Sequence, residues 1–316
     1  MKSPKDEGSI PSTSTGPPGR AVRPGQPISA FRGRARRHGT MGVVMADRGP
    51  ARHDASEDES SGLSSAFART VAEGEERLAR TWPGLISTGM TAGFDVGFGV
   101  LALLIVKHGT GSELLAALAF TIGFVALTLG NVELFTENFL VPIGTLVAGR
   151  SSARELVRLW ATTLTFNLVG GWSLTALTMS GYPNLHHAAV EIGRHYPDIG
   201  IGWRSFSGAL LGGGIMTLMT WLERSTPSIV ARLVVAISVA FVLAAAPLNH
   251  VIVVSLEMFA ALQAGAPFGY GSWLAVAAWY TLGNMIGGIV LVTGLRLVQV
   301  GMDRISEPRA EAEGEG

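Results

Sequence analysis

The chain contains no cysteine, and this absence excludes disulfide bonds and any metal site built on thiolate ligands. Charged side chains are scarce: they make up 15% of the 316 residues, and none stands between Glu257 and Arg296. A net charge of zero gives no electrostatic basis for a nucleic-acid partner. No secretory signal is expected, because no apolar segment follows the first charged residues. What remains is 47% hydrophobic, and its long charge-free run is typical of membrane-spanning helices.

Composition divides the chain into four parts. Residues 1–65 are rich in Pro, Gly, Ser and Arg and carry too little apolar surface to repay ordering, so we expect a disordered tail. Its arginines could contact anionic lipid or RNA, but a solvated tail is the simpler interpretation. The other expected parts are a cytoplasmic amphipathic lead-in at 66–84, a transmembrane domain at 85–300 and an acidic C-terminal tail at 301–316.

Six hydrophobic blocks lie in the expected transmembrane domain. They run near 86–106, 113–149, 157–180, 205–222, 229–262 and 271–298. A helix needs about 20 residues to cross a bilayer, so the second and fifth blocks are too long for one straight crossing. Each of the two also contains polar residues and a proline. The sequence therefore predicts an all-α membrane protein with six transmembrane helices, of which the second and fifth are broken near the midplane.

The distribution of positive side chains predicts the orientation. Cytoplasmic loops carry the excess of Lys and Arg in membrane proteins. If both termini are cytoplasmic, the inner loops hold Arg150, Arg154, Arg158, Arg224 and Arg232, and the outer loops hold Lys107, Arg194 and Arg204. This excess predicts a multi-pass protein of the cell (inner) membrane with both termini in the cytoplasm.

A short motif recurs in the third and sixth blocks. FNLVGG and GNMIGG both read Asn-x-x-Gly-Gly, with Asn167 and Asn284 in register. With three spans per copy, the second copy enters from the opposite side, which predicts an inverted 3+3 repeat around a substrate path. The alternative is that the motif is ordinary packing material: small residues let backbones approach, and Asn bonds across helices. On either interpretation, the two asparagines are expected to join helices.

Several segments resemble the signature sequences of the formate/nitrite transporter family. The segments are ELFTEN (133–138), LNHVIVVSLEMF (248–259), YTLGNMIGG (280–288), TAGFDVGFG (91–99) and FNLVGG (166–171). The resemblance covers residues from about 80 to 300. It implies a six-helix protomer with an aquaporin-like inverted repeat, assembled as a homopentamer with one path per protomer. It also implies passage of small monovalent anions such as formate or nitrite, often coupled to protons.

The resemblance assigns candidate residues of the transport path. The family's central histidine falls on His250, in the break of the fifth block, and the threonine that faces it falls on Thr136. Apolar positions of the family's loop and constrictions fall on Leu134, Phe135, Phe120, Phe124 and Leu243.

The chain also departs from the family's pattern. Asn249 replaces the carboxylate that often precedes the histidine, and Val254 replaces an asparagine that follows it. At the vestibule, Ile201 takes the place of a lysine, which leaves Arg204 as the nearest cation, and Thr217 replaces an asparagine of the fourth span. The chain therefore resembles a divergent branch with altered vestibule chemistry.

These residues suggest a mechanism of weak-acid transport. A bare anion is costly to bury in hydrocarbon, and the N-terminus of a half-helix or a proton lowers that cost. We hypothesise that an anion receives a proton through or near His250 and crosses as the acid, while Thr136 orients the imidazole or the substrate. Glu133 and Glu137 are expected to be structural and to satisfy backbone N–H groups freed by the break.

Other functional classes are less well supported. An aquaporin-like pore for neutral solutes or undissociated acids would share the fold, but the Asn-Pro-Ala motifs of such channels are missing. A membrane sensor that uses the N-terminal tail stays an alternative. An enzyme is not expected, because no HExxH or nucleophile elbow occurs in the spans. No cofactor or metal is expected either: His186, His187 and His195 could bind one, but a hydrated loop is the simpler interpretation.

Overall fold

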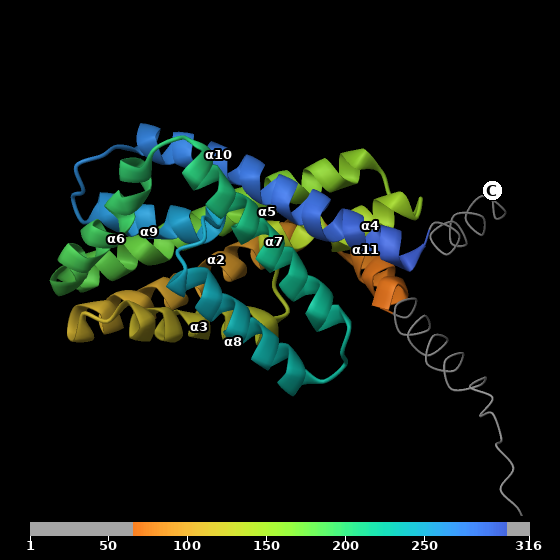
Figure 1. Cartoon of the computed structure of the whole chain (residues 1–316), viewed down its shortest axis with the longest axis horizontal. Helices are drawn as coiled ribbons and strands as arrows, with labels where there is room; N and C mark the ends of the chain where they lie inside the picture. Colours follow the sequence, from red (N-terminus) through yellow and green to blue (C-terminus); the bar gives the residue numbers. More distant parts are fainter. Residues whose placement is uncertain (1–65, 302–316) are drawn as a thin grey trace, which may run out of the picture. The chain divides into compact units, whose positions relative to one another are not determined.

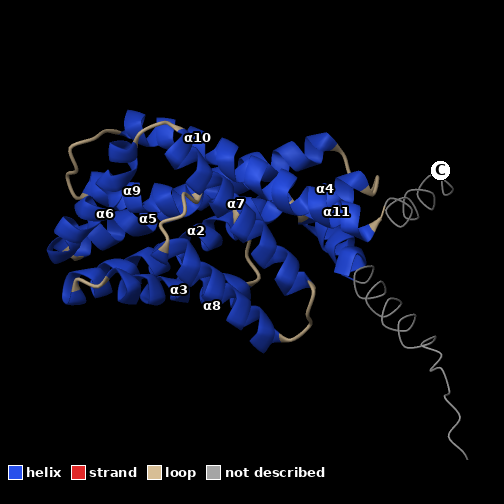
Figure 2. Cartoon of the chain, viewed as in Figure 1, coloured by secondary structure: helices blue, strands red, loops and turns tan. Residues whose placement is uncertain are grey.

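The structure is a computed structural model, and it describes residues 66–301. The tail expected at 1–65 lies outside the described residues, as does all of the tail expected at 301–316 except its first residue. Between residues 66 and 301 the chain forms helices and connecting loops without a strand (Figure 2). The all-α prediction is therefore confirmed for this part of the chain.

The helices follow one another with short connections (Figure 1). The first is a helix over 66–79, which we call the lead-in helix. After it come α2 (Trp82–Thr110), α3 (Glu113–Gly130), η1 (Phe135–Phe139), α4 (Val141–Val147), α5 (Ala153–Gly181), η2 (Pro183–Leu185), α6 (His186–Ile199), α7 (Trp203–Arg224), α8 (Ile229–Ala245), α9 (Val251–Gln263), α10 (Tyr270–Ile286), η3 (Gly287–Gly294) and α11 (Leu295–Val300).

Several of these helices have the length and composition of membrane spans. Among the described residues, four runs qualify by length and hydropathy: α2, α3, α7 and the continuous run from α10 to α11. Shorter apolar helices occupy Phe135–Val147, Ile229–Ala245 and Val251–Gln263. Each predicted hydrophobic block thus corresponds to one helix or to a series of helices. The segment expected to be a hydrated loop with three histidines instead forms α6, which packs against α9.

Glycines allow two helix pairs to pack at very short distances. A Cβ placed at Gly93 of α2 would lie 2.3 Å from the backbone oxygen of Asn167 in α5. A Cβ at Gly213 of α7 would lie 2.1 Å from the backbone oxygen of Asn284 in α10. Only glycine permits such a close backbone approach. The pairs α2–α5 and α7–α10 therefore bring the two motif asparagines into the interior by the same device.

The lead-in helix is amphipathic and packs against the main helical body. Its buried positions recur at helical spacing: Ala66, Phe67, Thr70, Val71, Gly74, Arg77 and Leu78. Thr145 of α4 donates a hydrogen bond to the backbone oxygen of Val71 (3.2 Å), and Gly74 lies so close to Thr145 that a Cβ there would clash with it. The lead-in helix is consequently fixed to the segment that follows α3.

Candidate functional site

Two helical runs are interrupted, and the candidate residues lie at these points. The first interruption begins where α3 ends at Gly130: Asn131 adopts a left-handed conformation (φ 48°), and regular structure resumes with η1 at Phe135. The second interruption covers 246–250, between the end of α8 and the start of α9. Interrupted helices leave backbone N–H and C=O groups without intrahelical partners, so these groups need partners from elsewhere.

Asn167 supplies those partners at the first interruption. Its Oδ1 accepts a hydrogen bond from the backbone N–H of Phe135 (2.8 Å). Its Nδ2 donates to the backbone oxygens of Gly89 in α2 (2.9 Å) and of Glu133 (3.2 Å). One buried amide therefore connects α5 and α2 to the interrupted segment.

Asn284 does the same at the second interruption. Its Oδ1 accepts from the backbone N–H of Val251 (2.8 Å), and its Nδ2 donates to the backbone oxygens of Ala209 in α7 (2.7 Å) and of Asn249 (2.9 Å). The prediction that both motif asparagines join helices is confirmed. Their additional role as backbone partners was missed, although the repeated Asn-x-x-Gly-Gly motif was the signal that could have indicated it.

The two interruptions meet through a contact between His250 and Thr136. Thr136 Oγ1 lies 2.7 Å from His250 Nε2, and both residues are fully buried. His250 is also the N-cap of α9: its Nδ1 accepts a hydrogen bond from the backbone N–H of Val253 (3.4 Å). A nitrogen that accepts cannot carry the ring proton, so this geometry places the proton on Nε2, which donates to Thr136.

The apolar candidates are buried in the interior. Phe120 and Phe124 lie on successive turns of α3 with their rings tilted and the ring centroids 5.6 Å apart, and both are fully buried. Leu134 is the fully buried N-cap residue of η1. Phe135 lies edge-on to the ring of Phe139, at a centroid distance of 5.0 Å. All of these residues belong to one hydrophobic cluster, which also includes Leu243.

The polar candidates around the second interruption occupy different surroundings. The side chain of Asn249 donates to the backbone oxygen of Ser205 (2.7 Å) and thereby connects the interruption to α7. Thr217 is fully buried, donates to the backbone oxygen of Gly213 (2.9 Å) and packs against Gly288. Arg204 is exposed on the first turn of α7. The structure therefore places Asn249 next to His250 in the chain and in space, and it places Thr217 inside the helix packing.

A cavity of about 320 Å³ lies on the α6 side of the second interruption. Its apolar lining includes Leu243, Leu248 and Val253, and its polar lining is formed by Glu113, Glu191, His195, Tyr196 and Glu257. We call it the α6 cavity. Arg204 and Thr217 are not among its lining residues.

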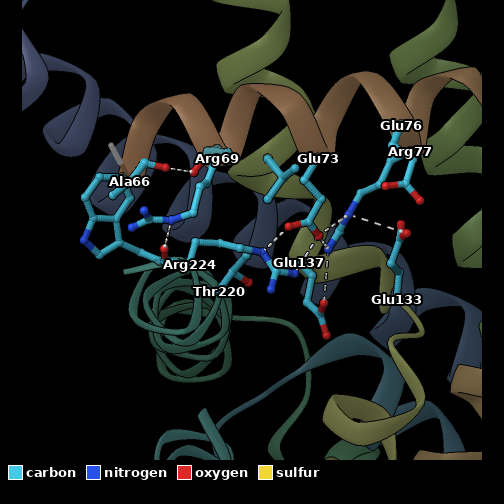
Figure 3. A network of polar contacts seen from close by, with 12 residues as sticks. Ala66, Arg69, Glu73, Glu76, Arg77, Glu133, Glu137, Thr220 and Arg224 are labelled. Atoms are coloured by element: carbon cyan, nitrogen blue, oxygen red, sulfur yellow. Dashed lines mark hydrogen bonds and ion pairs between the residues drawn. The ribbon is translucent and has the colours of Figure 1, made fainter. Parts of the chain in front are cut away.

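A second cavity, of about 560 Å³, lies beside the first interruption and contains a network of ionic contacts (Figure 3). Arg77 of the lead-in helix is almost fully buried. Its guanidinium donates to Asn138 Oδ1 (2.9 Å) and forms ion pairs with Glu133 (3.4 Å) and Glu137 (3.9 Å). Glu73, one turn earlier on the same helix, accepts from Arg77 Nη2 at 2.5 Å. We call this cavity the lead-in cavity.

The ionic contacts correct the expected role of the glutamates. Glu133 and Glu137 were expected to accept hydrogen bonds from freed backbone N–H groups. In the structure the freed N–H of Phe135 bonds to Asn167, while Glu133 pairs with Arg77 and Arg80. The physical reason is that the lead-in helix inserts a buried guanidinium at this point, and a buried cation requires carboxylate partners.

The three histidines of α6 were considered above as metal ligands. No group of three metal-ligating side chains occurs among residues 66–301. His186 Nε2 instead lies 2.8 Å from the backbone oxygen of Met179, where it connects α6 to the end of α5.

Comparison with known proteins gives consistent results. The family model described as Formate/nitrite transporter matches residues 64–298. The chain is 26% identical over 255 residues to the inner membrane protein YfdC of Escherichia coli (strain K12), covering 76% of this chain and 79% of that protein. It is 23% identical over 235 residues to the uncharacterized transporter YrhG of Bacillus subtilis (strain 168), covering 70% of this chain and 87% of that protein.

Two solved structures share the fold. One is described as an FNT family ion channel, with a TM-score of 0.63 and 18% identity, covering 72% of this chain and 96% of that chain. The other is described as a pentameric formate channel with formate bound, with a TM-score of 0.56 and 20% identity, covering 67% of this chain and 94% of that chain.

Proposed function

This chain belongs to the formate/nitrite transporter family, and we propose that it carries small monovalent anions of the formate or nitrite type, or their undissociated acids, across a membrane. The family consists of channels and transporters rather than enzymes, and the chain is a multi-pass membrane protein. The observation that carries the proposal is the contact of 2.7 Å between Thr136 and His250. It joins two interrupted helical runs that lie far apart in the sequence, at the place where the family resemblance locates the transport path.

The architecture that we propose is six membrane-spanning helices in an inverted 3+3 repeat, with the second and fifth broken at the midplane. The matching hydrogen bonds of Asn167 and Asn284 support it. The amide of Asn167 binds the carbonyl oxygen of residue 133 and the N–H of residue 135, and that of Asn284 binds the carbonyl oxygen of residue 249 and the N–H of residue 251. Such a repeat places broken helices around a common path. We further propose a homopentamer, by analogy with the formate channel of the same fold, and cytoplasmic termini, from the distribution of arginine.

The two facing residues can lower the cost of moving an acid through a dry constriction. Since His250 Nε2–H donates to Thr136 Oγ1, the threonine hydroxyl hydrogen is free to donate to a substrate oxygen. The first turn of α9, which starts at Val251, presents a positive dipole end toward the same place. Buried apolar side chains such as Phe120 and Leu134 would exclude hydrated ions. In this proposal the substrate takes up a proton, through or near His250, and passes as a neutral molecule.

The test is a flux measurement with purified protein in proteoliposomes. Formate, nitrite, acetate, lactate and hydrosulfide would be supplied at two pH values. We expect uptake of at least one of them above that of protein-free liposomes, with a dependence on pH. Uptake of none would overturn the proposed function and would leave the fold unaffected.

A pair of variants separates the proposed role of His250 in proton transfer from its structural role as the N-cap of α9. His250→Asn keeps a side-chain acceptor at the N-cap of α9 but removes the titratable ring, so the protein should fold while the pH dependence of uptake changes. His108→Asn, on the exposed last turn of α2, is the matched control and should behave like the unmodified protein. An identical pH profile for His250→Asn would remove His250 from the mechanism.

A further inference from the structure

Glu257 is a buried carboxylate that the proposed path does not yet use. It follows His250, the N-cap of α9, by seven residues, which corresponds to almost two helical turns. The rise between them is about 10 Å along the helix axis. Val253 lies between them and lines the α6 cavity together with Glu257. Glu257 therefore faces the cavity that leads toward the second interruption.

A specific partner holds the carboxyl group of Glu257 in place. The hydroxyl of Tyr196, on α6, donates a short hydrogen bond to Glu257 Oε2. Both side chains are about 95% buried. The ring of Tyr196 is in turn fixed edge-on against Tyr280 of α10, at a centroid distance of 6.3 Å. A buried carboxyl group with one oriented donor and a cavity beside it is a built feature of the interior rather than a solvated surface charge.

The other charged groups at the α6 cavity do not neutralise Glu257. Lys107 of α2 pairs with Glu113 of α3 and with Glu191 of α6, the latter at 3.1 Å. The single ammonium therefore already faces two carboxylates, and the other titratable groups of the lining besides Glu257 are His195 and Tyr196. Among the described residues the lining contains no arginine or lysine. When its carboxyl groups are ionised, the cavity is an acidic compartment.

We propose that Glu257, positioned by Tyr196, is a specificity-determining residue that makes the α6 cavity admit the undissociated acid and exclude its anion. The inference rests on the proposed function and refines it, because it names the form of the substrate that passes this cavity. An ionised Glu257 repels a carboxylate or nitrite anion in a region of low dielectric constant. A protonated Glu257 is neutral, so in neither state does its carboxyl group offer the anion the positive charge that it needs.

The experiment compares the pH dependence of formate flux in proteoliposomes for the unmodified protein, Glu257→Gln and Glu257→Asp. If only the acid passes, flux falls about tenfold for each pH unit above the pKa of formic acid, as the acid fraction does. Glu257→Gln removes the negative charge, and we expect a shallower pH profile and a voltage-driven formate current at neutral pH at least about tenfold above the background of the unmodified protein. Glu257→Asp keeps the charge and should keep the steep profile.

Two further variants serve as controls. Tyr196→Phe removes the hydrogen bond and leaves the carboxyl group, so a smaller change in the same direction is expected. Glu75→Gln alters a carboxylate of the lead-in helix that lines neither cavity, and it should leave both the profile and the current unchanged. Thermal melting in detergent checks that each variant is folded.

The outcomes are distinguishable. A folded Glu257→Gln protein with the original steep profile and no formate current would overturn the inference. If that variant does not fold, an unchanged profile for Tyr196→Phe would overturn it instead. Failure of the unmodified protein to move any of the supplied acids would overturn the proposed function itself.

Discussion

The two interruptions share their backbone support and differ in their charges. At each of them an asparagine amide accepts one freed N–H and donates to two carbonyl oxygens in matching positions. The first interruption is surrounded by buried ionic groups centred on Arg77. The second has His250 as a helix cap and the neutral amide of Asn249 beside it.

This comparison separates the groups that position the backbone from the side chains that could act on a substrate. The asparagine contacts are made to the backbone, so they hold the chain in place whatever the side chains of the interruption are. The side chains are consequently free to differ between the two interruptions. The first interruption has an ionic connection to the lead-in helix, and the second provides the imidazole of His250 to the proposed path.

Removal of the amide of Asn167 or Asn284 should have the largest effect on stability, because each amide provides the backbone support that both interruptions need. Asn284→Ala leaves the N–H of Val251 and the carbonyl oxygen of Asn249 without this partner and removes the bond to Ala209 of α7, and each buried unsatisfied group costs about 1–3 kcal/mol. Asn167→Ala should destabilise the protein to a similar extent. The melting temperature in detergent measures the effect of both substitutions. Asn184→Ala, at an exposed position, is the control. Normal melting of Asn284→Ala would show that the amide is not a structural connection.

Replacement of Arg77 should affect the first interruption alone. Arg77→Met keeps the length of the side chain but leaves Glu133 and Glu137 without their buried cation, and loss of one partner of a buried ion pair costs about 3–5 kcal/mol. Arg80→Met, at a position that is 24% exposed, should lower the free energy of unfolding by about 1 kcal/mol or less. Thermal melting of the two variants measures the difference. Equal melting temperatures would contradict a central role for Arg77.

The smallest effect concerns the response of this ionic network to pH. Burial alone would raise the pKa of Glu73, but Arg77 and Arg224 outweigh it and hold the pKa below its ordinary value of 4.5. The stabilisation that Glu73 contributes is therefore complete above 4.5, the pKa of the unfolded state. It is lost as the pH falls through the lower pKa of the folded state. Melting temperatures recorded between neutral and acidic pH should show this loss, and Glu73→Gln should reduce it. If the melting temperature falls equally at acidic pH in both proteins, Glu73 does not contribute to the loss of stability.

The extent of the helices could be predicted from the sequence because it depends on local properties. Six apolar blocks correspond to six helices or series of helices, and the two blocks that are too long for one crossing are those in which the helix is interrupted. The motif around Asn167 and Asn284 also indicated contacts between helices. Hydropathy did not indicate α6, because its balance of apolar and polar residues is that of a surface helix rather than of a membrane span.

Hydropathy and block length are properties of the chain itself and determined the helical class, and the signature segments, such as ELFTEN at 133–138, determined the family resemblance. The tertiary structure decided which groups pair in the interior. Arg77 meets Glu133 and Asn138 only because the lead-in helix packs against the first interruption, and Tyr196 meets Glu257 only because α6 packs against α9. These partners are more than fifty residues apart in sequence, and no local pattern specifies such a contact, because it depends on how whole helices pack.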